Sequence, residues 1–525
     1  MLCTAAQKPL TVVKKKKPEM DTNLDKRAEV FHKLPLDFAE TENLNSIKMG
    51  YSYLLTSVSW PRLLATVALV FAIQGIYLWM LVIDEIVWFL PLICAMASIL
   101  IYYFCASKQI YMVEVSCYRP PQEWRVSFHN FIEHAMISQK FTAKSVGFQK
   151  RILERAAVSE YAAVPPALRY LPPRLTHAAS RQEAEIVMFG CVRDLLEKTG
   201  VDVHEVGVLV VNCSVFNPIP SLSSLIVNKF GLRSDIKTYN LGGMGCSANL
   251  IALDLASACL RVSNRGTYAI VLSTENITEN WYFGNYEPML VSNILFRIGC
   301  GAVLLSNKRS DRHRAKYRLL NVVRTQRAGV SDIAYRAAFQ EEDPTGTVGV
   351  NLSKDIMDIA AEALKANMRE LGPLVLPYYE QILYFTSRFF VFYYENAVKG
   401  AAREYVPDFK SAFDHICIHS GGKAVIRAVE KGLGLRPEMA EASKMVLYRF
   451  GNTSSSSTWY QFQYLESKGR MRKGQKIWQI CLGSGFKCNS AVWVANIDIA
   501  PPGDNAWSEC IIDYPVQIPE IQPIS

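Results

Sequence analysis

One stretch of the chain could carry chemistry directly: YNLGGMGCSANLIALDLASACL, residues 239–260. Gly242, Gly243 and Gly245 lead to Cys246, and the small and apolar residues that follow recur at helical spacing. A thiol at the start of a helix lies near the positive end of the helix dipole, which lowers its pKa and favours the thiolate. The pattern therefore predicts Cys246 as a nucleophile.

Two other interpretations of this segment stay open on local evidence. A lone cysteine is more often a buried structural side chain than a nucleophile. The order Gly243-x-Gly245-x-x-Ala248 also fits the dinucleotide-binding pattern G-x-G-x-x-A. That pattern needs an acidic residue about 20 positions further on, and the closest candidate, Glu275, comes later, after a predicted strand. The dinucleotide interpretation is therefore the weaker one.

The second half of the chain holds residues that could act with a cysteine. His419 ends the apolar run HICIHS, and catalytic groups of α/β proteins collect at such strand ends. His415 begins the same run, so we expect it at the opposite end of the strand in a structural role. Asn452, in RFGNTSSSSTWY, opens a predicted helix, where it is either an N-cap or an amide donor for an oxyanion. Gly483 and Gly485, in GSGFKCNSAVW, form a strand-end loop that either offers backbone N–H groups or only turns the chain.

A thiol, an imidazole and an amide permit two chemistries. One is hydrolysis, as in thiol proteases. The other is acyl transfer with carbon–carbon bond formation, in which the cysteine takes an acyl group as a thioester. A malonyl thioester then loses carbon dioxide, His and Asn donate hydrogen bonds to the enolate oxygen, and the enolate carbon attacks the acyl-cysteine. Neither a metal nor a redox cofactor is needed.

An α/β core must position these residues. Continuous apolar runs of the kind found in strands buried on both faces occur at residues 206–212, 268–274, 301–307, 415–420, 478–484 and 490–497. The order strand, helix, Gly-Leu-Arg, helix-opening motif, strand occurs twice, so Cys246 and Asn452 hold equivalent places. We therefore expect two similar halves about a pseudo-twofold axis that brings both helix starts to the centre, although two unrelated α/β units could share this order by chance.

The composition is that of a globular protein, with 50% hydrophobic and 20% charged residues among 525. Thirteen cysteines without a C-x-x-C pair indicate neither a zinc site nor a disulfide framework, and they favour a reducing compartment. The net charge of +9 includes the run Lys14 to Lys17, which is either a solvated tail or a contact with an anionic membrane face. No interleaving of basic and aromatic residues suggests nucleic-acid binding.

Two uncharged apolar runs, 63–83 and 86–106, each reach the ~20 residues that span a bilayer, and Asp84 and Glu85 separate them. They predict a transmembrane hairpin, with a pair of buried core helices as the alternative. Basic residues outside both runs predict that both outer flanks are cytosolic.

A third apolar stretch, residues 374–394, is rich in aromatic side chains. It contains Glu380 and Arg388, and a charge at the bilayer centre costs about 2.5–3.5 kcal/mol, so a third span is not expected. We expect an interfacial or cap segment near a lipid substrate, or else a buried helix.

Six segments together resemble the plant 3-ketoacyl-CoA synthases, the condensing enzymes of very-long-chain fatty acid elongation. They are NLGGMGCSANLIALDLA, STENITENWYFGN, MLVSNILFRIGCGAVLLSN, HICIHSGGKAVI, RFGNTSSSSTWY and GSGFKCNSAVWVA. The resemblance runs from the predicted hairpin to about Ile497. It implies that Cys246, His419 and Asn452 are the catalytic residues.

The resemblance also implies a thiolase-like, five-layered αβαβα fold of two pseudo-repeated halves, usually as a homodimer. The expected divisions are a basic tail and lead-in (1–62), two transmembrane helices (63–106), a half with the cysteine (107–335), a half with His and Asn (336–500) and a tail (501–525). The hairpin is expected to hold the chain in the endoplasmic reticulum membrane, with the catalytic domain facing the cytosol.

The implied reaction is a decarboxylative Claisen condensation of malonyl-CoA with a long-chain acyl-CoA. It would use no cofactor and would yield 3-oxoacyl-CoA, CoA and carbon dioxide. The implied partners are membrane lipid and the other elongase enzymes: a 3-ketoacyl-CoA reductase, a 3-hydroxyacyl-CoA dehydratase and an enoyl-CoA reductase.

The chain departs from the family pattern at two positions. Tyr448 and Gln326 stand where the family usually has histidines, whereas His415 matches a further family histidine. These departures keep one alternative, a catalytically impaired scaffold or regulator of an elongase complex. A second alternative is a type III polyketide-synthase-like condensing enzyme of the same fold, but such enzymes are typically soluble, so the predicted hairpin argues against it.

Overall fold

The computed structural model describes residues 60–79, 94–98, 108–263, 266–397, 405 and 407–519. The chain divides into two compact units, residues 1–106 and 107–525, and each is described by itself. In the first unit, helix α3 (Trp60–Trp79) covers most of the first predicted span and exposes apolar side chains such as Leu69 and Phe71. Apart from 94–98, the second predicted span and the acidic turn before it lie outside the described residues. Within the described parts of the chain, no helix is both long and apolar enough to cross a membrane.

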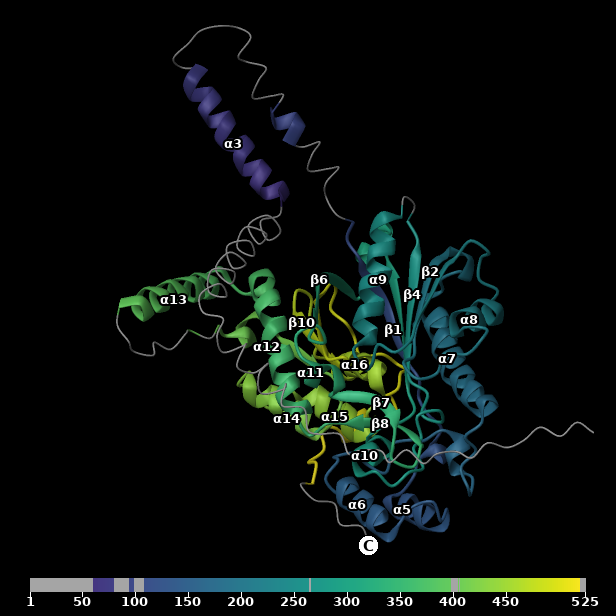
Figure 1. Cartoon of the computed structure of the whole chain (residues 1–525). Coiled ribbons are helices and arrows are strands. Elements are labelled where there is room, and N and C mark those ends of the chain that lie inside the picture. The colour runs from purple at the N-terminus through teal and green to yellow at the C-terminus, as the bar shows by residue number, and fades with distance from the viewer. Residues whose placement is uncertain are drawn as a thin grey trace, which may run out of the picture. The chain divides into compact units, whose positions relative to one another are not determined.

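The second unit is built on one nine-stranded sheet with the strand order β3-β2-β4-β5-β1-β6-β11-β10-β9 (Figure 1). The strands are β1 (Tyr111–Cys117), β2 (Val206–Asn212), β3 (Lys237–Leu241), β4 (Tyr268–Thr274), β5 (Cys300–Ser306), β6 (Tyr317–Gln326), β9 (His415–Ile418), β10 (Lys476–Gly483) and β11 (Lys487–Ala495). A separate hairpin consists of β7 (Ala338–Glu342) and β8 (Val348–Leu352).

The pairing directions confirm the predicted internal repeat. In one half, β2 pairs with β4 in parallel, and β4–β5 and β5–β1 are antiparallel. In the other half, β9 pairs with β10 in parallel, and β10–β11 and β11–β6 are antiparallel. The halves join where β1 meets β6. Strand β6 therefore belongs by its pairing to the second half, although it falls within the range 107–335.

Three apolar clusters place the helices in layers about these strands. The central cluster contains side chains of α9 (Ala248–Val262) and α16 (Ser457–Ser467) together with strands of both halves. A second cluster joins α7 (His177–Thr199) and α8 (Leu222–Phe230) to the first half. A third joins α12 (Ile356–Val375) and α14 (Lys423–Gly432) to the second half. Helices α9 and α16 therefore share a core with strands of both halves, and each half also packs on its own pair of helices.

The remaining helices of this unit surround the layers. They are α5 (Phe128–Ile137), α6 (Ala143–Leu153), α10 (Glu287–Leu295), α11 (Asp332–Arg336), α13 (Tyr378–Ala397) and α15 (Glu441–Phe450). Over residues 501–519, where the structure describes this last part of the chain, there is only one short turn of helix, yet the Trp507 side chain is fully buried in the central cluster.

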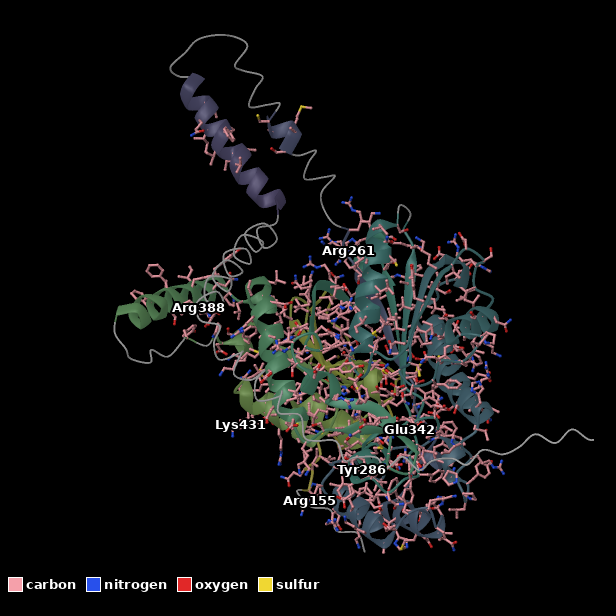
Figure 2. All side chains as sticks on the ribbon, in the orientation of Figure 1. Arg155, Arg261, Tyr286, Glu342, Arg388 and Lys431 are labelled. Atoms are coloured by element: carbon pink, nitrogen blue, oxygen red, sulfur yellow. The ribbon has the colours of Figure 1, made fainter. Side chains whose placement is uncertain are left out.

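Helix α13 contains most of the aromatic stretch 374–394. Tyr378, Phe389 and Phe390 are 78%, 66% and 62% exposed, so the alternative of a buried helix is wrong. Figure 2 shows Arg388 among the side chains that project from this helix. Hydrogen bonds tie α13 to the segment that follows it: the buried Glu380 accepts the Tyr405 hydroxyl at 2.7 Å and the Asp408 N–H at 3.0 Å, and the Ser387 hydroxyl accepts the Tyr405 N–H at 2.9 Å.

Candidate active site

Cys246 lies in a tight turn that ends two residues before α9. The turn needs glycine, because Gly243 and Gly245 have φ values of +66° and +71°, which side chains rarely adopt. The Ala248 N–H donates to the Gly245 carbonyl at 3.0 Å, and Ser247, rather than Cys246, holds the N-cap position of α9. The sequence thus placed the cysteine correctly, just before the helix and not in its first turn.

The thiol of Cys246 is protonated in the resting site. Although the residue is only half-buried overall, burial raises the pKa of the thiol to about 11, against a smaller lowering by a hydrogen bond from the Ser454 hydroxyl. The pKa is therefore shifted in the direction opposite to that expected for a thiol before a helix, because burial is the largest cause of the shift. A base must take the proton before this thiol can attack.

Glu275, which follows β4, organises the surroundings of the cysteine. Its carboxylate accepts the Ser214 and Val215 N–H groups at 2.9 and 3.1 Å and the Ser454 hydroxyl at 3.1 Å. It thereby ties the ends of β2 and β4 to the segment before α16. These bonds occupy the carboxylate that the dinucleotide interpretation would assign to a ribose, so the structure speaks against that interpretation.

His419 directly follows β9, as predicted, and 4% of its surface is exposed. Burial lowers the pKa of its imidazole to about 4, so the ring is neutral at neutral pH. Its Nδ1 lies 2.9 Å from the Ser457 hydroxyl. Because a hydroxyl can donate or accept, Ser457 can support either ring tautomer, and the other nitrogen, Nε2, can accept a proton or donate a hydrogen bond.

Asn452 is held on three sides just before α16. Its backbone pairs with the segment after α10, through hydrogen bonds with Leu295 and Arg297 at 2.9 Å each. Its Oδ1 accepts the Ser454 N–H at 2.8 Å, and its Nδ2 makes only a long contact of 3.4 Å with the Gly421 carbonyl. The amide therefore remains a donor, whereas the predicted N-cap role is wrong, because Thr453 holds the N-cap position of the next turn and Ser456 that of α16. Asn452 precedes a short 3-10 turn, not the first turn of α16 itself.

The loop after β10 locks against the loop that carries the cysteine. A Cβ on Gly483 would lie 2.8 Å from the Ser247 nitrogen, and one on Gly245 would lie 2.6 Å from the Ser484 nitrogen, so both positions accept only glycine. The Lys487 ammonium donates to the Ser484 carbonyl at 2.6 Å and makes a longer contact with the Met244 carbonyl. These bonds tie the two loops together.

One cavity of about 440 Å³ collects the predicted residues. Its lining includes Cys246, His419, Asn452, Gln326, Gly483 and Gly485. Two further candidates lie elsewhere. The His415 ring contacts Gln475 at 3.3 Å at the start of β9, which fits its predicted structural role, and Tyr448 packs against the central apolar cluster.

Four polar residues at the site were missed by sequence reasoning: Glu275 as an organiser, Ser454, Ser457 and Lys487. The serines lie in the quoted segment NTSSSST and Lys487 in GSGFKCN, but a serine-rich or glycine-rich loop gives no signal for which side chain turns inward. Hairpin β7–β8 also contributes to the cavity through residues such as Phe339 and Val350. Across the described ranges, no group of three or more His, Cys, Asp or Glu side chains is placed to hold a metal ion.

Two family patterns match the second unit. Residues 102–392 match the family described as FAE1/Type III polyketide synthase-like protein, and residues 410–495 match the C-terminal domain of 3-oxoacyl-[acyl-carrier-protein] synthase III. The chain is 48% identical to 3-ketoacyl-CoA synthase 4 of Arabidopsis thaliana over 92% of its own length and 94% of that protein. It is also 48% identical to 3-ketoacyl-CoA synthase 9 of the same plant, over 93% of this chain and 95% of that one.

Solved structures share the fold at low sequence identity. A type III pentaketide synthase from Neurospora crassa superposes with a TM-score of 0.55 at 16% identity, covering 74% of this chain and 99% of the other. The type III polyketide synthase domain of Steely1 from Dictyostelium gives 0.56 at 16% identity, covering 74% and 100%. The α/β fold with two pseudo-repeated halves is therefore that of the thiolase and chalcone-synthase group.

Proposed function

This chain belongs to the 3-ketoacyl-CoA synthase family, and on that premise we propose how its own residues carry out the condensation. It is a condensing acyltransferase that joins an acyl-CoA to malonyl-CoA in very-long-chain fatty acid elongation. The observation that carries the proposal is the single cavity in which a thiol, a neutral imidazole and an amide donor meet.

In the first half-reaction, His419 acts as the base. Its neutral imidazole takes the proton from Cys246, whose raised pKa keeps the thiol protonated until substrate arrives. The sulfur attacks the acyl-CoA carbonyl, the bond from that carbon to CoA sulfur breaks, and CoA leaves with the proton. Cys246 then holds the acyl group as a thioester, and His419 is neutral again.

In the second half-reaction, malonyl-CoA loses carbon dioxide. The electron pair of the broken bond passes into the thioester carbonyl, and the enolate oxygen accepts hydrogen bonds from the His419 Nε2–H and the Asn452 amide. The enolate carbon attacks the acyl carbonyl, the carbon–sulfur bond to Cys246 breaks, and the thiolate regains a proton from solvent. The products are 3-oxoacyl-CoA, carbon dioxide and CoA, and neither a metal nor a redox cofactor takes part.

The two departures from the family pattern fall outside the proposed catalytic set. Tyr448 packs on the central cluster, and Gln326 lies at the rim with a long contact of 3.5 Å to the Gly485 carbonyl. Neither side chain interrupts the set of Cys246, His419 and Asn452. This favours an active enzyme over a scaffold.

We further propose that the enzyme works at the endoplasmic reticulum membrane with its second unit in the cytosol. Support comes from the uncharged runs 63–83 and 86–106, the basic flanks and the family resemblance. The same resemblance supports a homodimer and an association with the reductase, dehydratase and enoyl reductase of the elongation cycle.

Microsomes that contain the full chain, supplied with labelled malonyl-CoA and a panel of acyl-CoAs, test the proposal. We expect a labelled 3-oxoacyl-CoA that disappears in Cys246→Ala. A well-folded wild-type protein that neither condenses nor decarboxylates malonyl-CoA would support the scaffold alternative. Products extended by several malonyl units would support the polyketide-synthase-like one.

A further inference from the structure

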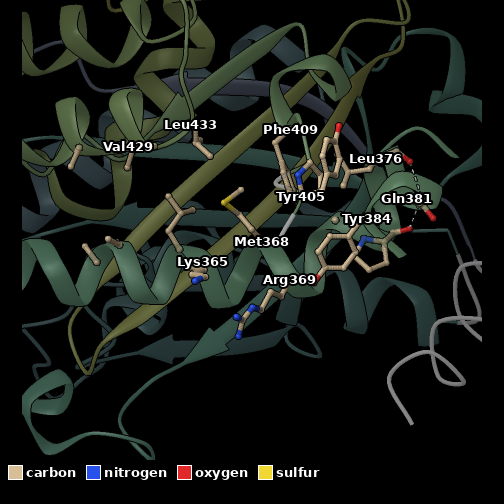
Figure 3. A pocket seen from close by; sticks show the side chains of 18 of the residues that line it. Lys365, Met368, Arg369, Leu376, Gln381, Tyr384, Tyr405, Phe409, Val429 and Leu433 are labelled. Atoms are coloured by element: carbon tan, nitrogen blue, oxygen red, sulfur yellow. Dashed lines mark hydrogen bonds between the residues drawn. The ribbon is translucent and has the colours of Figure 1, made fainter. Parts of the chain in front are cut away.

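A second cavity lies beside the catalytic one, between α12, the base of α13 and α14. Its volume is about 390 Å³, which is within the range of small-molecule sites. Figure 3 shows its two ends. Val429 of α14 and Leu433, which directly follows α14, lie at one end, and Tyr384, Tyr405 and Phe409 gather at the other, with Met368 of α12 between them. The proposed mechanism gives this cavity no role.

The two cavities share part of their wall, which we call the constriction. Ala360 of α12 and Val425 of α14 line both of them. A Cβ on Gly421 would lie 3.0 Å from His419 Nε2 and 3.8 Å from a Val425 methyl group. Gly421 therefore separates the imidazole from Val425 at this point. The shared wall therefore lies close to His419, and the residues between them, Gly421, Val425 and Ala360, are small or apolar.

The second cavity suits a hydrocarbon. Its interior is formed by Leu364, Met368, Leu376, Phe409 and other apolar side chains, and the charged groups of α12 that border it are exposed. Those charged residues are Lys365 and Arg369. A long alkyl chain gains free energy on leaving water for such a lining, at roughly 25 cal/mol for each Å² buried.

Hydrogen bonds fix the outer wall of this cavity. The Gln381 amide donates to the Leu376 carbonyl at 2.7 Å and to the Pro373 carbonyl at 3.3 Å, which fastens α13 to the end of α12 (Figure 3). The Glu380 carboxylate holds Tyr405 at 2.7 Å from the other side. From this base α13 places Tyr384 and Phe385 at the cavity and leaves other aromatic side chains exposed.

We infer that the cavity between α12, α13 and α14 receives the distal part of the acyl chain, which enters it from the catalytic cavity between Ala360 and Val425. This inference rests on the proposed function and adds to it the place where chain length is measured. A chain too short to pass the constriction gains nothing from the second cavity. A longer chain gains binding energy with each methylene group placed there.

The first test narrows the constriction from either side. Ala360→Phe and Val425→Phe should lower the ratio of condensation rates for eicosanoyl-CoA over decanoyl-CoA by about tenfold or more, because the pocket excludes the longer chain. Val425 is half-buried, so this variant is the safer one for folding. Ala366→Leu, on α12 but outside both cavities, is the matched control and should leave the ratio unchanged.

The second test locates the end of the chain without turnover. Eicosanoyl-CoA with a photoreactive diazirine at its terminal carbon, bound to the full-length Cys246→Ala protein, should label peptides that contain Met368, Tyr384 or Phe409. Labelling of hairpin β7–β8 instead, together with an unchanged rate ratio in Val425→Phe, would overturn the inference. Failure of the wild-type protein to condense either substrate would overturn the proposed function, and the labelling pattern still decides where the chain lies.

Discussion

At rest, Cys246 and His419 are both uncharged. Burial raises the pKa of the thiol to about 11 and lowers that of the imidazole to about 4, so the proton remains on sulfur. The site differs in this respect from cysteine sites that hold a preformed thiolate.

The raised thiol pKa predicts slow alkylation. In the free enzyme, the rate of reaction of Cys246 with iodoacetamide should rise by about tenfold per pH unit between roughly pH 7 and 9, since the thiolate fraction grows at that rate below the pKa. Mass spectrometry of the peptide that contains Cys246 separates this reaction from those of the other cysteines. A rate that no longer changes above pH 7 would mean that the pKa of the Cys246 thiol is lowered, as expected for a thiol beside a helix N-terminus.

The lowered imidazole pKa predicts a broad acidic range of activity. The base form of His419 is lost only as the pH falls toward about 4, well below the ordinary value of 6.5. We expect kcat/KM for the acyl-CoA to show no acidic limb near pH 6.5. Stopped assays from pH 8 down to the limit of stability measure this, and a limb centred at pH 6.5 would contradict it.

The amide of Asn452, which among the described residues makes only a long hydrogen bond of 3.4 Å to the Gly421 carbonyl, predicts a specific defect in decarboxylation. Asn452→Ala should slow malonyl-CoA decarboxylation by about 10²–10³, the usual cost of one lost oxyanion donor. Asn452→Asp is the control for folding, because it keeps the oxygen that accepts the Ser454 N–H but lacks the donor. It should fold like the wild type and be at least as slow. Normal decarboxylation by this aspartate variant would remove Asn452 from the mechanism.

At the scale of residues, the sequence indicated which side chains form the candidate site but not the pKa values of those side chains. Cys246, His419 and Asn452 could be found because each stands at a strand or helix end in a quoted motif. The pKa shifts and the polar network of Glu275, Ser454 and Ser457 could not, because they depend on how far packing from both halves excludes water.

At the scale of elements, the interlocked loops are the critical feature. Gly483 approaches the start of α9 so closely that a Cβ would meet Ser247 at 2.5 Å. Two loops from different halves thus fix the cysteine against the end of β10.

We predict that Gly483→Ala lowers the free energy of unfolding by about 1–3 kcal/mol, as overpacking does, and also impairs acylation of Cys246. Gly329→Ala is the matched control, because nothing lies within 4 Å of its Cβ. Chemical denaturation of both variants measures the difference. Equal stability of the two would mean that the loops can separate without cost.

Most of the buried strands were predictable, but β1 was missed although its sequence, YMVEVSC, is almost fully buried, and the more polar strands were missed as well. The runs 206–212 and 268–274 coincide with β2 and β4, whose side chains are almost all buried. Strands β3 and β6 escaped prediction because their sequences, KTYNL and YRLLNVVRTQ, carry many polar side chains. Their positions depend on neighbours in the sheet and not on a local apolar run.

At the scale of the whole molecule, the pseudo-twofold arrangement explains why distant segments share one cavity. The carboxyl ends of β4 and β10 are equivalent, and they deliver Glu275 and Gly483 to the same place. The repeat could be seen in the sequence because both halves keep the same order of elements. The hairpin β7–β8 and helix α13 break the symmetry, so only the structure places them.

The last part of the chain completes the core. The fully buried indole of Trp507 donates to the Tyr460 carbonyl at 2.9 Å in the central layer. Trp507→Ala should therefore cost about 3–5 kcal/mol of unfolding free energy. Substitution of the exposed Ile512 by alanine, in the same segment, is the control and should have little effect. Thermal or denaturant unfolding measures both, and a small effect of Trp507→Ala would show that residues 501–519 are not part of the cooperative unit.

The central claim is that Cys246 carries the acyl group. The most direct measurement is to incubate the full-length protein with a long-chain acyl-CoA without malonyl-CoA, and to map the acyl mass by peptide mass spectrometry. We predict a thioester on Cys246 that is lost on addition of malonyl-CoA and that forms much more slowly in His419→Ala. An acyl group on another residue, or no acyl-enzyme from protein that still condenses, would contradict the mechanism.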